Sequence, residues 1–320
     1  MTQRNFSIDV LKFICALLVV LLHTKWMYQN ELLPITRCAV PCFFMISGYL
    51  LYTRGGIGIV KLKRNIIHIA VITLWATLLF LLWKELLSIK NNVIYIPTKI
   101  DIINWIIFND CPFAFHLWYL YAYIYVLIII LIIDFYNKWK ILFSFIPLLL
   151  MIDLIYGTYS CLFWDRIFPY IYVRNFMFVG LPYFSLGALI KHKGFNWITN
   201  KYLLVAGICL FSILTFIEKS ILVNMNMVAI REHYISTTFL AICIFSLAIS
   251  VNTAKYSLFA KYGKDYSLYI YIIHPIFIFL LSFFFQKLGL FKIYLWIAPV
   301  LIILLSIIFI GVIRKYNIIK

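Results

Sequence analysis

Residues 8–27 read IDVLKFICALLVVLLHTKWM, an apolar stretch long enough to span a membrane that carries Asp9, Lys12 and His23. Each residue of an α-helix turns the chain by about 100°, so the eleven steps from Lys12 to His23 return to within roughly 20° of the same face, about 16 Å further on. Asp9 lies three residues before Lys12 and is therefore its neighbour on that face. The stretch predicts a membrane helix with an ionisable stripe.

Ionisable groups inside a membrane helix are costly, by about 2.5–3.5 kcal/mol for a charged residue at the helix centre on insertion scales. They usually face a bundle interior or a wet cavity, which makes all three residues candidates for function. Lys12 has a second interpretation, in which it extends to the inner interface and pairs with Asp9. His23 could simply lie near the outer interface, but an imidazole is also suited to act as a general base near neutral pH.

The composition predicts an integral membrane protein. Of 320 residues, 65% are hydrophobic and only 12% are charged. The mean hydropathy of +1.01 is too high for a soluble domain of this size. A net charge of +17 would suggest nucleic acid as the partner of a soluble protein. In a membrane protein, Lys and Arg instead flank the spans on the cytoplasmic side, so we expect membrane lipids as partners and no nucleic acid.

Ten apolar segments predict an all-α, polytopic membrane helical bundle that forms a single domain over residues 1–320. The segments are 8–27, 37–53, 65–83, 113–134, 141–157, 174–190, 202–217, 234–251, 267–285 and 291–313. Most Lys and Arg residues fall in one alternating set of ends and short loops, which predicts that both termini are cytoplasmic. Between the third and fourth segments, Thr98 and Asp101 have the spacing of a helix start, so we expect a short helix on the membrane surface there.

Residues 54–64, RGGIGIVKLKR, combine three glycines with four cations on the expected cytoplasmic side. Backbone N–H groups of a glycine-rich turn and nearby cations can converge on a phosphate. Lys61, Lys63 and Arg64 are therefore candidates for binding a phosphate-bearing ligand. The same composition is typical of a turn whose cations only follow the positive-inside rule, and position alone leaves both interpretations open.

Residues 37–52, RCAVPCFFMISGYLLY, form an apolar run that Pro41 and the pair Ser47-Gly48 are expected to interrupt. One interpretation is a kinked packing helix with a small-residue notch that admits another helix. The other is a bent helix that lines the cavity holding His23.

Two aromatic motifs contain further histidines. Residues 116–120, HLWYL, begin the fourth segment and are typical either of an interfacial aromatic belt or of a sugar-stacking surface with a ring nitrogen beside it. Residues 266–275, YSLYIYIIHP, place His274 inside the ninth segment, where it is either a packing residue or a functional one. Cys38 and Cys42 share a helix face but have no nearby histidine, so no metal is expected.

Together these motifs resemble the acyltransferase-3 family of bacterial membrane acyltransferases over most of the chain. Five stretches carry the resemblance, in the order of the family: FSIDVLKFICALLVVLLH, RCAVPCFFMISGYLLY, KLKR, HLWYL and YSLYIYIIHP. The family typically transfers an acyl group, usually acetyl, from cytoplasmic acyl-CoA to a hydroxyl of a cell-surface or lipid-linked glycan. The resemblance therefore implies a stand-alone, acyl-CoA-dependent O-acyltransferase of the bacterial cytoplasmic membrane, with acetyl-CoA as the expected donor.

The resemblance also implies roles for individual residues. His23 matches the essential histidine of the family, and Lys12, next to Asp9, matches its basic partner, which is usually arginine. Lys61 and Arg64 match a cytoplasmic basic pair near the donor, although lysine lacks the two-pronged geometry of arginine. The residues expected to bind the acceptor are His116, Trp118, Ser47 and Arg37.

Three alternatives stay open from the sequence. The chain could be a degenerate family member that acts as an assembly subunit, although it retains His23 and Lys12. His23 could act as a general base or could itself carry the acyl group. A glycan-lipid transporter or flippase without acyl transfer would share a polar-lined bundle, although the sequence lacks the repeated halves with broken helices that many transporters have.

Overall fold

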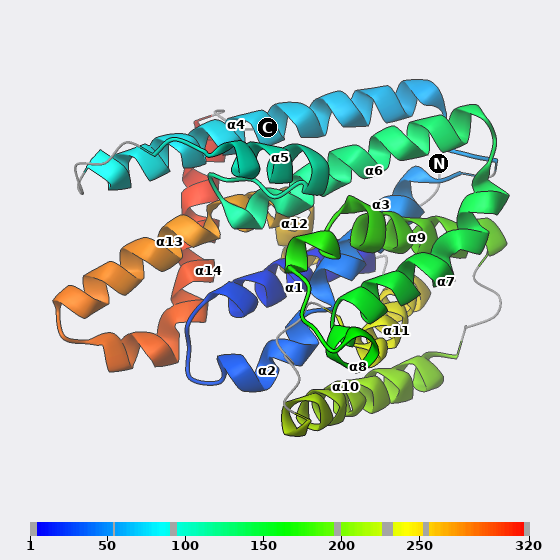
Figure 1. Ribbon diagram of the computed structural model, residues 1–320. Coiled ribbons are helices and arrows are strands. Elements are labelled where there is room, and N and C mark those ends of the chain that lie inside the picture. The colour runs from blue at the N-terminus through cyan, green and yellow to red at the C-terminus, as the bar shows by residue number, and fades with distance from the viewer. Residues whose placement is uncertain are drawn as a thin grey trace. The chain divides into compact units, whose positions relative to one another are not determined.

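Every regular element in the described part of the chain is helical (Figure 1). The computed structural model describes residues 5–53, 55–89, 95–194, 200–225, 233–251 and 256–316. Within these ranges an isolated bridge between Thr53 and Gly56 closes a turn and builds no sheet. The all-α architecture predicted from the sequence is confirmed. Arg54, one of the four cations of the glycine-rich stretch, lies outside the described residues.

The helices divide between two compact units. Unit 1 comprises Met1–Phe43, Asn196–Ile221 and Tyr234–Lys320, and unit 2 comprises Phe44–Phe195 and Leu222–His233. The helices of unit 1 are α1 (Phe6–His23), α2 (Gln29–Thr36), the start of α3 (Ala39–Leu51), most of α10 (Lys201–Asn224), α11 (Ile235–Val251), α12 (Leu258–Asp265), α13 (Ser267–Lys287) and α14 (Phe291–Lys315). Unit 2 contains the rest of α3, then α4 (Ile59–Ile89), α5 (Lys99–Phe108), η1 (Phe115–Leu117), α6 (Trp118–Phe135), α7 (Trp139–Tyr156), α8 (Ser160–Trp164), η2 (Tyr170–Tyr172), η3 (Phe176–Gly180) and α9 (Leu181–Lys193). A single domain over the whole chain stays a prediction.

Eight helices in the described residues are long and apolar enough to cross a membrane, so the protein is a polytopic membrane protein. They are Phe6–His23, Gln29–Leu51, Ile59–Ser88, Phe115–Phe135, Trp139–Tyr156, Lys201–Asn224, Ser267–Lys287 and Phe291–Lys315. Of the other predicted segments, 234–251 folds as the 17-residue α11, and 174–190 folds as a π-helical turn followed by the 13-residue α9. The count of ten and the cytoplasmic termini stay predictions, and residues 1–4 and 317–320 lie outside the described ranges.

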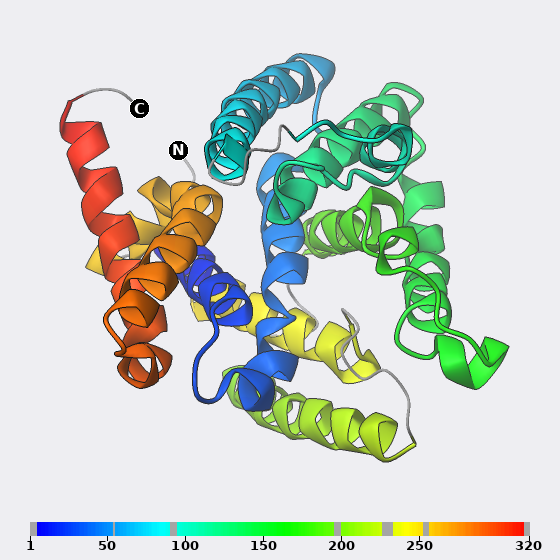
Figure 2. The same ribbon diagram turned by 60° about the vertical axis from the view of Figure 1, so that its left-hand side comes forward.

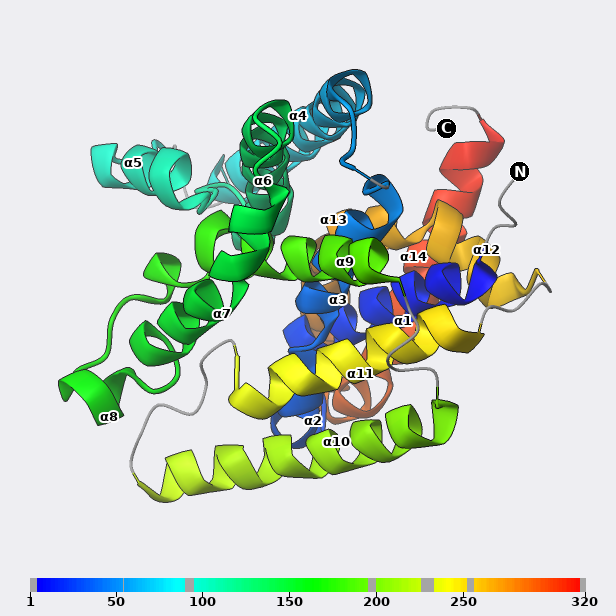
Figure 3. The same ribbon diagram turned by 90° about the vertical axis from the view of Figure 1, so that its right-hand side faces the viewer.

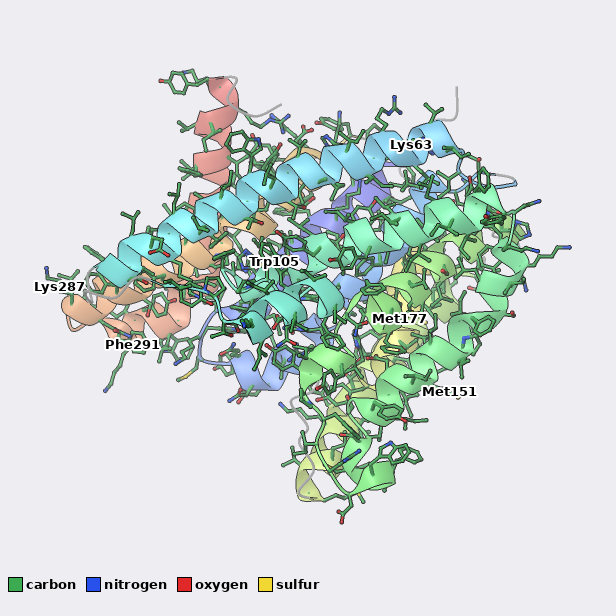
Figure 4. All side chains as sticks on the ribbon, turned by 45° about the horizontal axis from the view of Figure 1, so that its top comes forward. Lys63, Trp105, Met151, Met177, Lys287 and Phe291 are labelled. Atoms are coloured by element: carbon green, nitrogen blue, oxygen red, sulfur yellow. The ribbon has the colours of Figure 1, made fainter. Side chains whose placement is uncertain are left out.

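Helix α1 is the centre of unit 1, where it contacts α2, α11, α12, α13 and α14. Helices α13 and α14 form a hairpin beside α1 (Figure 2), and Figure 4 labels Lys287 and Phe291 on the two sides of its turn. The turn contains Gly289 at φ 71°, a conformation that favours glycine. On another side of α1, a Cβ at Gly263 of α12 would fall 1.6 Å from the Asp9 carbonyl oxygen, so the two backbones are in direct contact. The central position of α1 turns its stripe toward protein rather than lipid.

In unit 2, helices α3 and α9 lie against each other (Figure 3). A glycine of each helix lies at the contact. A Cβ on Gly48 would fall 1.9 Å from the Phe184 carbonyl oxygen, and a Cβ on Gly187 would fall 2.0 Å from the Met45 carbonyl oxygen. Glycines at a crossing let two membrane helices approach backbone to backbone. The notch predicted at Gly48 is therefore a helix-packing site.

Helices α4 and α6 run side by side in unit 2 and share a hydrogen bond of 2.7 Å between the Thr77 and Tyr121 hydroxyls (Figure 1). Helix α4 is 31 residues long and begins at Ile59, earlier than the predicted segment 65–83. The cations at positions 61–64 are therefore on its first turns and not in the preceding turn. Helix α5 begins at the predicted cap, where the Thr98 hydroxyl accepts from the Asp101 N–H and the Asp101 carboxylate accepts from the Thr98 N–H.

Candidate active site

The ionisable stripe of α1 faces the interior of unit 1. Asp9 is only 3% exposed, and Ala16 and Val19, which continue the stripe, are also buried. Lys12 and His23 are half-buried. Since apolar residues surround the stripe, its polar groups find partners within the protein.

Asp9 and Lys12 form an ion pair at the start of α1. The Lys12 ammonium lies 3.2 Å from a carboxylate oxygen of Asp9, and the two side chains are 23% and 4% exposed respectively. Three helical turns separate this pair from His23. The ion pair agrees with the interpretation that Lys12 pairs with Asp9, and a role of either residue in the chemistry of His23 stays a prediction.

His23 instead stacks on His274, which comes from α13. The ring centroids are 5.5 Å apart and the ring planes differ by 23°. His274 is fully buried, and Figure 2 shows α13 lying along α1. Sequence reasoning had no basis for pairing these residues, since 251 positions separate them. The two rings are hereafter called the histidine pair. An imidazole can act as a general base near neutral pH, so the pair is a candidate for acid–base chemistry.

The two acceptor candidates in residues 37–52 lie in different units. Arg37 caps the end of α2 in unit 1 and is half-buried, whereas Ser47 lies within α3 in unit 2 and hydrogen-bonds the Tyr123 hydroxyl. Helix α3 is continuous through Ser47, and Pro41 lies in its first turn, where the missing N–H costs nothing. The predicted kink or bend stays a prediction. The roles of Arg37 and Ser47 in binding also stay predictions.

The glycine turn, residues 55–58, is closed by a carboxylate from α6. The Ile57 and Gly58 N–H groups each donate to Asp134 at 2.9 Å, and the Trp139 indole N–H donates to the same carboxylate at 2.8 Å. Gly55, Gly56 and Gly58 all have positive φ, which explains the three glycines. Two of the backbone N–H groups that could have bound a phosphate, those of Ile57 and Gly58, therefore already donate to a protein carboxylate.

The three cations that follow the turn project from the first turns of α4. Lys63 and Arg64 are exposed, and Figure 4 labels Lys63 near this end of the helix. Lys61 is half-buried, and its ammonium donates to the Leu51 carbonyl at 2.7 Å. Lys61 thus links α4 to the end of α3 through a hydrogen bond, whereas the side chains of Lys63 and Arg64 are exposed.

Two basic residues that the sequence did not single out join the same end of α3. The His192 ring lies 2.8 Å from the Tyr52 hydroxyl, and the Lys191 ammonium lies 4.6 Å from the centre of the Tyr49 ring. Both come from the last turn of α9. Their position just after a predicted span could have identified these two residues from the sequence. Cations at such a position follow the positive-inside rule and can also bind a ligand.

The HLWYL motif places two buried rings at the start of α6. His116 is 2% exposed and packs edge-on against Phe80, with centroids 4.7 Å apart. Trp118 is 6% exposed, and the Arg174 guanidinium lies 5.3 Å from the centre of its ring. The rings are thus interior residues, and a role of His116 or Trp118 in binding an acceptor stays a prediction.

Arg174 links this motif to an acid that the sequence did not single out. Its guanidinium lies 4.2 Å from the centre of the Tyr170 ring and 3.9 Å from a carboxylate oxygen of Asp110. Burial raises the pKa of Asp110 above its usual value, against the opposing effect of the nearby Arg174 charge. Arg174, Asp110 and Trp118 together form a polar and aromatic cluster, the arginine cluster.

A buried acid–histidine contact lies in unit 2. His233 Nδ1 is 3.1 Å from a carboxylate oxygen of Asp153, and both side chains are at most 5% exposed. The Thr158 hydroxyl also donates to the His233 carbonyl. Asp153 could have been identified from the sequence as a candidate, because it is an acid inside the fifth predicted membrane segment. Among the described residues, no group of three or more His, Cys, Asp or Glu could hold a metal ion.

The fold and these sites define a polytopic membrane protein in which half-buried His23 of the first helix stacks on fully buried His274 of α13. A family model described as an acyltransferase domain, that of the acyltransferase-3 family, matches residues 5–314. The match covers nearly the whole chain, and the protein belongs to this family of membrane acyltransferases.

A curated protein described as an amino-acid racemase, from Enterococcus faecalis, is 31% identical to the chain over 134 residues. This similarity covers 38% of the chain and 18% of the racemase. The chain thus spans less than a fifth of that relative, and similarity of this extent shows a shared segment and not a shared reaction. No solved structure matches the chain.

Proposed function

We propose that the protein is an O-acyltransferase of the bacterial cytoplasmic membrane. It would move an acyl group, acetyl in the simplest case, from cytoplasmic acyl-CoA to a hydroxyl of a cell-surface or lipid-linked glycan. The observation that carries the proposal is the contact between His23 and His274, within a chain that belongs to an acyltransferase family. An imidazole pair among apolar helices has the chemistry of a general base and has little purpose in a purely structural span.

In the proposed reaction His23 is the general base. Its ring nitrogen takes the proton of the acceptor hydroxyl while the hydroxyl oxygen attacks the thioester carbonyl carbon. The tetrahedral intermediate then collapses, the carbon–sulfur bond breaks, and the CoA thiolate takes up the proton from the imidazolium. The products are the glycan ester, free CoA and neutral His23. Transfer through an acyl-His23 intermediate gives the same products in two steps and is the second form of the mechanism.

The phosphates of the donor are proposed to bind the cations of α4. Lys63 and Arg64 are exposed, and Lys61 stands one turn before Arg64. Because Asp134 occupies the N–H groups of the glycine turn, charge neutralisation by the cations would carry the binding. Arg64 can bind a phosphate through two parallel hydrogen bonds, whereas the lysines act as point charges.

The acceptor is proposed to bind at the arginine cluster. A guanidinium donates to sugar oxygens, a carboxylate accepts from sugar hydroxyls, and an indole packs against the apolar face of a sugar ring. Arg174, Asp110 and Trp118 supply these three groups within one unit. His116 and Ser47 stay acceptor candidates on the basis of the family motifs.

The test compares His23→Ala with His68→Ala, a substitution of the same type at an exposed position of α4. Membranes that contain the wild-type protein should release free CoA when they receive acetyl-CoA and the acceptor glycan. His23→Ala should release none while still inserting, and His68→Ala should behave as wild type. NMR of surface glycans should show ester-linked acyl groups only where CoA is released.

Normal glycan acylation by the His23→Ala protein would overturn the proposal. Movement of a lipid-linked glycan across vesicles without CoA release would instead favour a transporter or flippase, because a carrier consumes no thioester.

A further inference from the structure

Pro275 directly follows His274 inside α13 and removes one hydrogen bond from that helix. In an α-helix the N–H of residue 275 would donate to the carbonyl of Tyr271, four residues earlier. Proline has no N–H, and its ring also pushes that carbonyl out of line. A buried carbonyl inside a membrane helix needs another donor, because no water is present to replace the lost one.

The imidazole of His274 is that donor. Its Nδ1 lies 2.8 Å from the Tyr271 carbonyl oxygen and 3.1 Å from the Ile270 carbonyl oxygen. A carbonyl oxygen only accepts hydrogen bonds, so Nδ1 carries the proton. In a neutral imidazole the lone pair is then on Nε2. The backbone of α13 itself therefore determines the orientation of the ring and the atom that can accept a proton.

Helix α14, which packs on α13, also contains a proline that leaves a carbonyl without its helical donor. This carbonyl accepts a hydrogen bond from the segment just after His23. Pro299 inside α14 removes the donor to the Leu295 carbonyl, and the Met27 N–H donates to that carbonyl at 2.9 Å. Met27 lies four residues beyond His23, so this bond fixes the chain just after α1. Two prolines on adjacent helices thus release carbonyls that hold, respectively, the His274 ring and the segment that follows His23.

We propose that Pro275 sets the tautomer and the orientation of His274, and that His274 is thereby a positioning residue for His23. The stacked contact at 5.5 Å transmits this constraint, because a fixed ring limits the directions in which the His23 ring can turn. The inference rests on the proposed function, in which His23 is the base, and adds the pair of residues that orients this base.

The tautomer is tested by ¹⁵N NMR of the full-length protein with labelled histidine, in lipid bilayers and without substrate. The protonated and lone-pair nitrogens of a neutral imidazole resonate far apart, and the His274→Asn variant identifies which of the six histidines gives each signal. We expect wild-type His274 to be neutral, with the proton on Nδ1. Pro275→Ala restores the N–H at position 275, and we expect it to shift part of the population to the Nε2–H form. A wild-type ring with its proton on Nε2, or an unchanged tautomer in Pro275→Ala, would overturn the inference.

Kinetics tests the positioning role with a matched control. Pro275→Ala favours helix formation and should fold, yet we expect its kcat to fall by about 10–100-fold with little change in KM, by analogy with the loss of a partner that orients a metal-bound histidine. Pro147→Ala makes the same change inside α7, where no histidine precedes the proline, and should leave kcat unchanged. A changed tautomer with wild-type kcat would overturn the positioning role. Because the tautomer is read without turnover, failure of the acyltransferase proposal would leave that measurement valid.

Discussion

The histidine pair of unit 1 and the glycine turn of unit 2 are both polar sites at membrane helices, but their backbone groups are used in opposite ways. At the histidine pair, a carbonyl released by Pro275 accepts a hydrogen bond from a side chain, and the imidazoles are the groups proposed to supply the chemistry. At the glycine turn, the side chain of Asp134 holds the backbone, and the N–H groups are no longer available to a ligand. At the first site, a backbone carbonyl orients a side chain. At the second site, a side-chain carboxylate orients backbone N–H groups.

This difference predicts different kinetic signatures. A ring that is held in place at the reacting atoms affects the transition state, so changes in unit 1 should lower kcat. Exposed cations on α4 can bind the donor equally in its ground and transition states, so changes there should raise KM. Four sets of substitutions test the comparison between the two units, and the largest effect is expected on α1.

The first prediction concerns the ion pair of α1. Asp9→Leu leaves Lys12 charged without this partner, and we expect a loss of about 2 kcal/mol, below the range for fully buried pairs because Lys12 is partly exposed. If Lys12 is the basic partner of His23, Lys12→Leu should lower the transfer rate by about 100-fold or more. Thermal unfolding in detergent and CoA release measure the two effects separately.

The double variant Asp9→Leu/Lys12→Leu provides the control, because it removes both charges from the stripe. We expect it to recover stability and to stay inactive. Wild-type transfer by this variant would show that the ion pair is structural only, which is the second interpretation of Lys12.

The next effect is expected at Asp134. Asp134→Asn keeps one carbonyl oxygen but places an NH₂ group against an N–H donor, so we expect a loss of about 1.5–3 kcal/mol, typical of a hydrogen bond to a charged group. The control is Asp165→Asn, which changes an exposed aspartate at φ 51°, a conformation that asparagine also adopts. An unchanged melting temperature for Asp134→Asn would mean that the turn does not depend on this carboxylate.

The helical features of both units were predictable because their rules are local. The stripe on α1 follows from the helical repeat, and the start of α5 follows from the spacing of Thr98 and Asp101. The glycine crossing of α3 was predicted as one of two interpretations, since small residues are typical of close helix contacts.

The partners within the sites could not be predicted in this way, because they come from distant parts of the chain. His274 meets His23 through the packing of α13 on α1, and Asp134 reaches the glycine turn across 77 positions. The turn illustrates the limit: its composition is right for binding an anion, but the anion present is a side chain of the protein. Only the packed structure distinguishes these cases.

A smaller effect is expected for the cations of α4. Lys63→Ala/Arg64→Ala should raise the KM for acyl-CoA by about tenfold, equivalent to about 1.4 kcal/mol, without changing kcat. The difference should shrink at high salt because exposed charges are screened. The control is Lys138→Ala/Lys140→Ala, which removes the same charge from exposed positions around the start of α7. A lower kcat with unchanged KM would contradict the assignment of these cations to donor binding.

The smallest effect is expected at α5, a well-formed helix start that belongs to neither site. Thr98→Ala removes the cap and should cost about 1 kcal/mol of local stability, seen as faster hydrogen exchange in residues 99–104, whereas Thr98→Ser should keep the cap. Hydrogen bonds from Thr98 hold the pKa of Asp101 below its usual value of 3.8, so the folded helix favours the ionised carboxylate. The contribution of Asp101 is therefore present above that pH and is lost as the pH falls below it. If Thr98→Ala also lowers the transfer activity, α5 takes part in the reaction. The comparison of the two sites would then omit an element that the reaction needs.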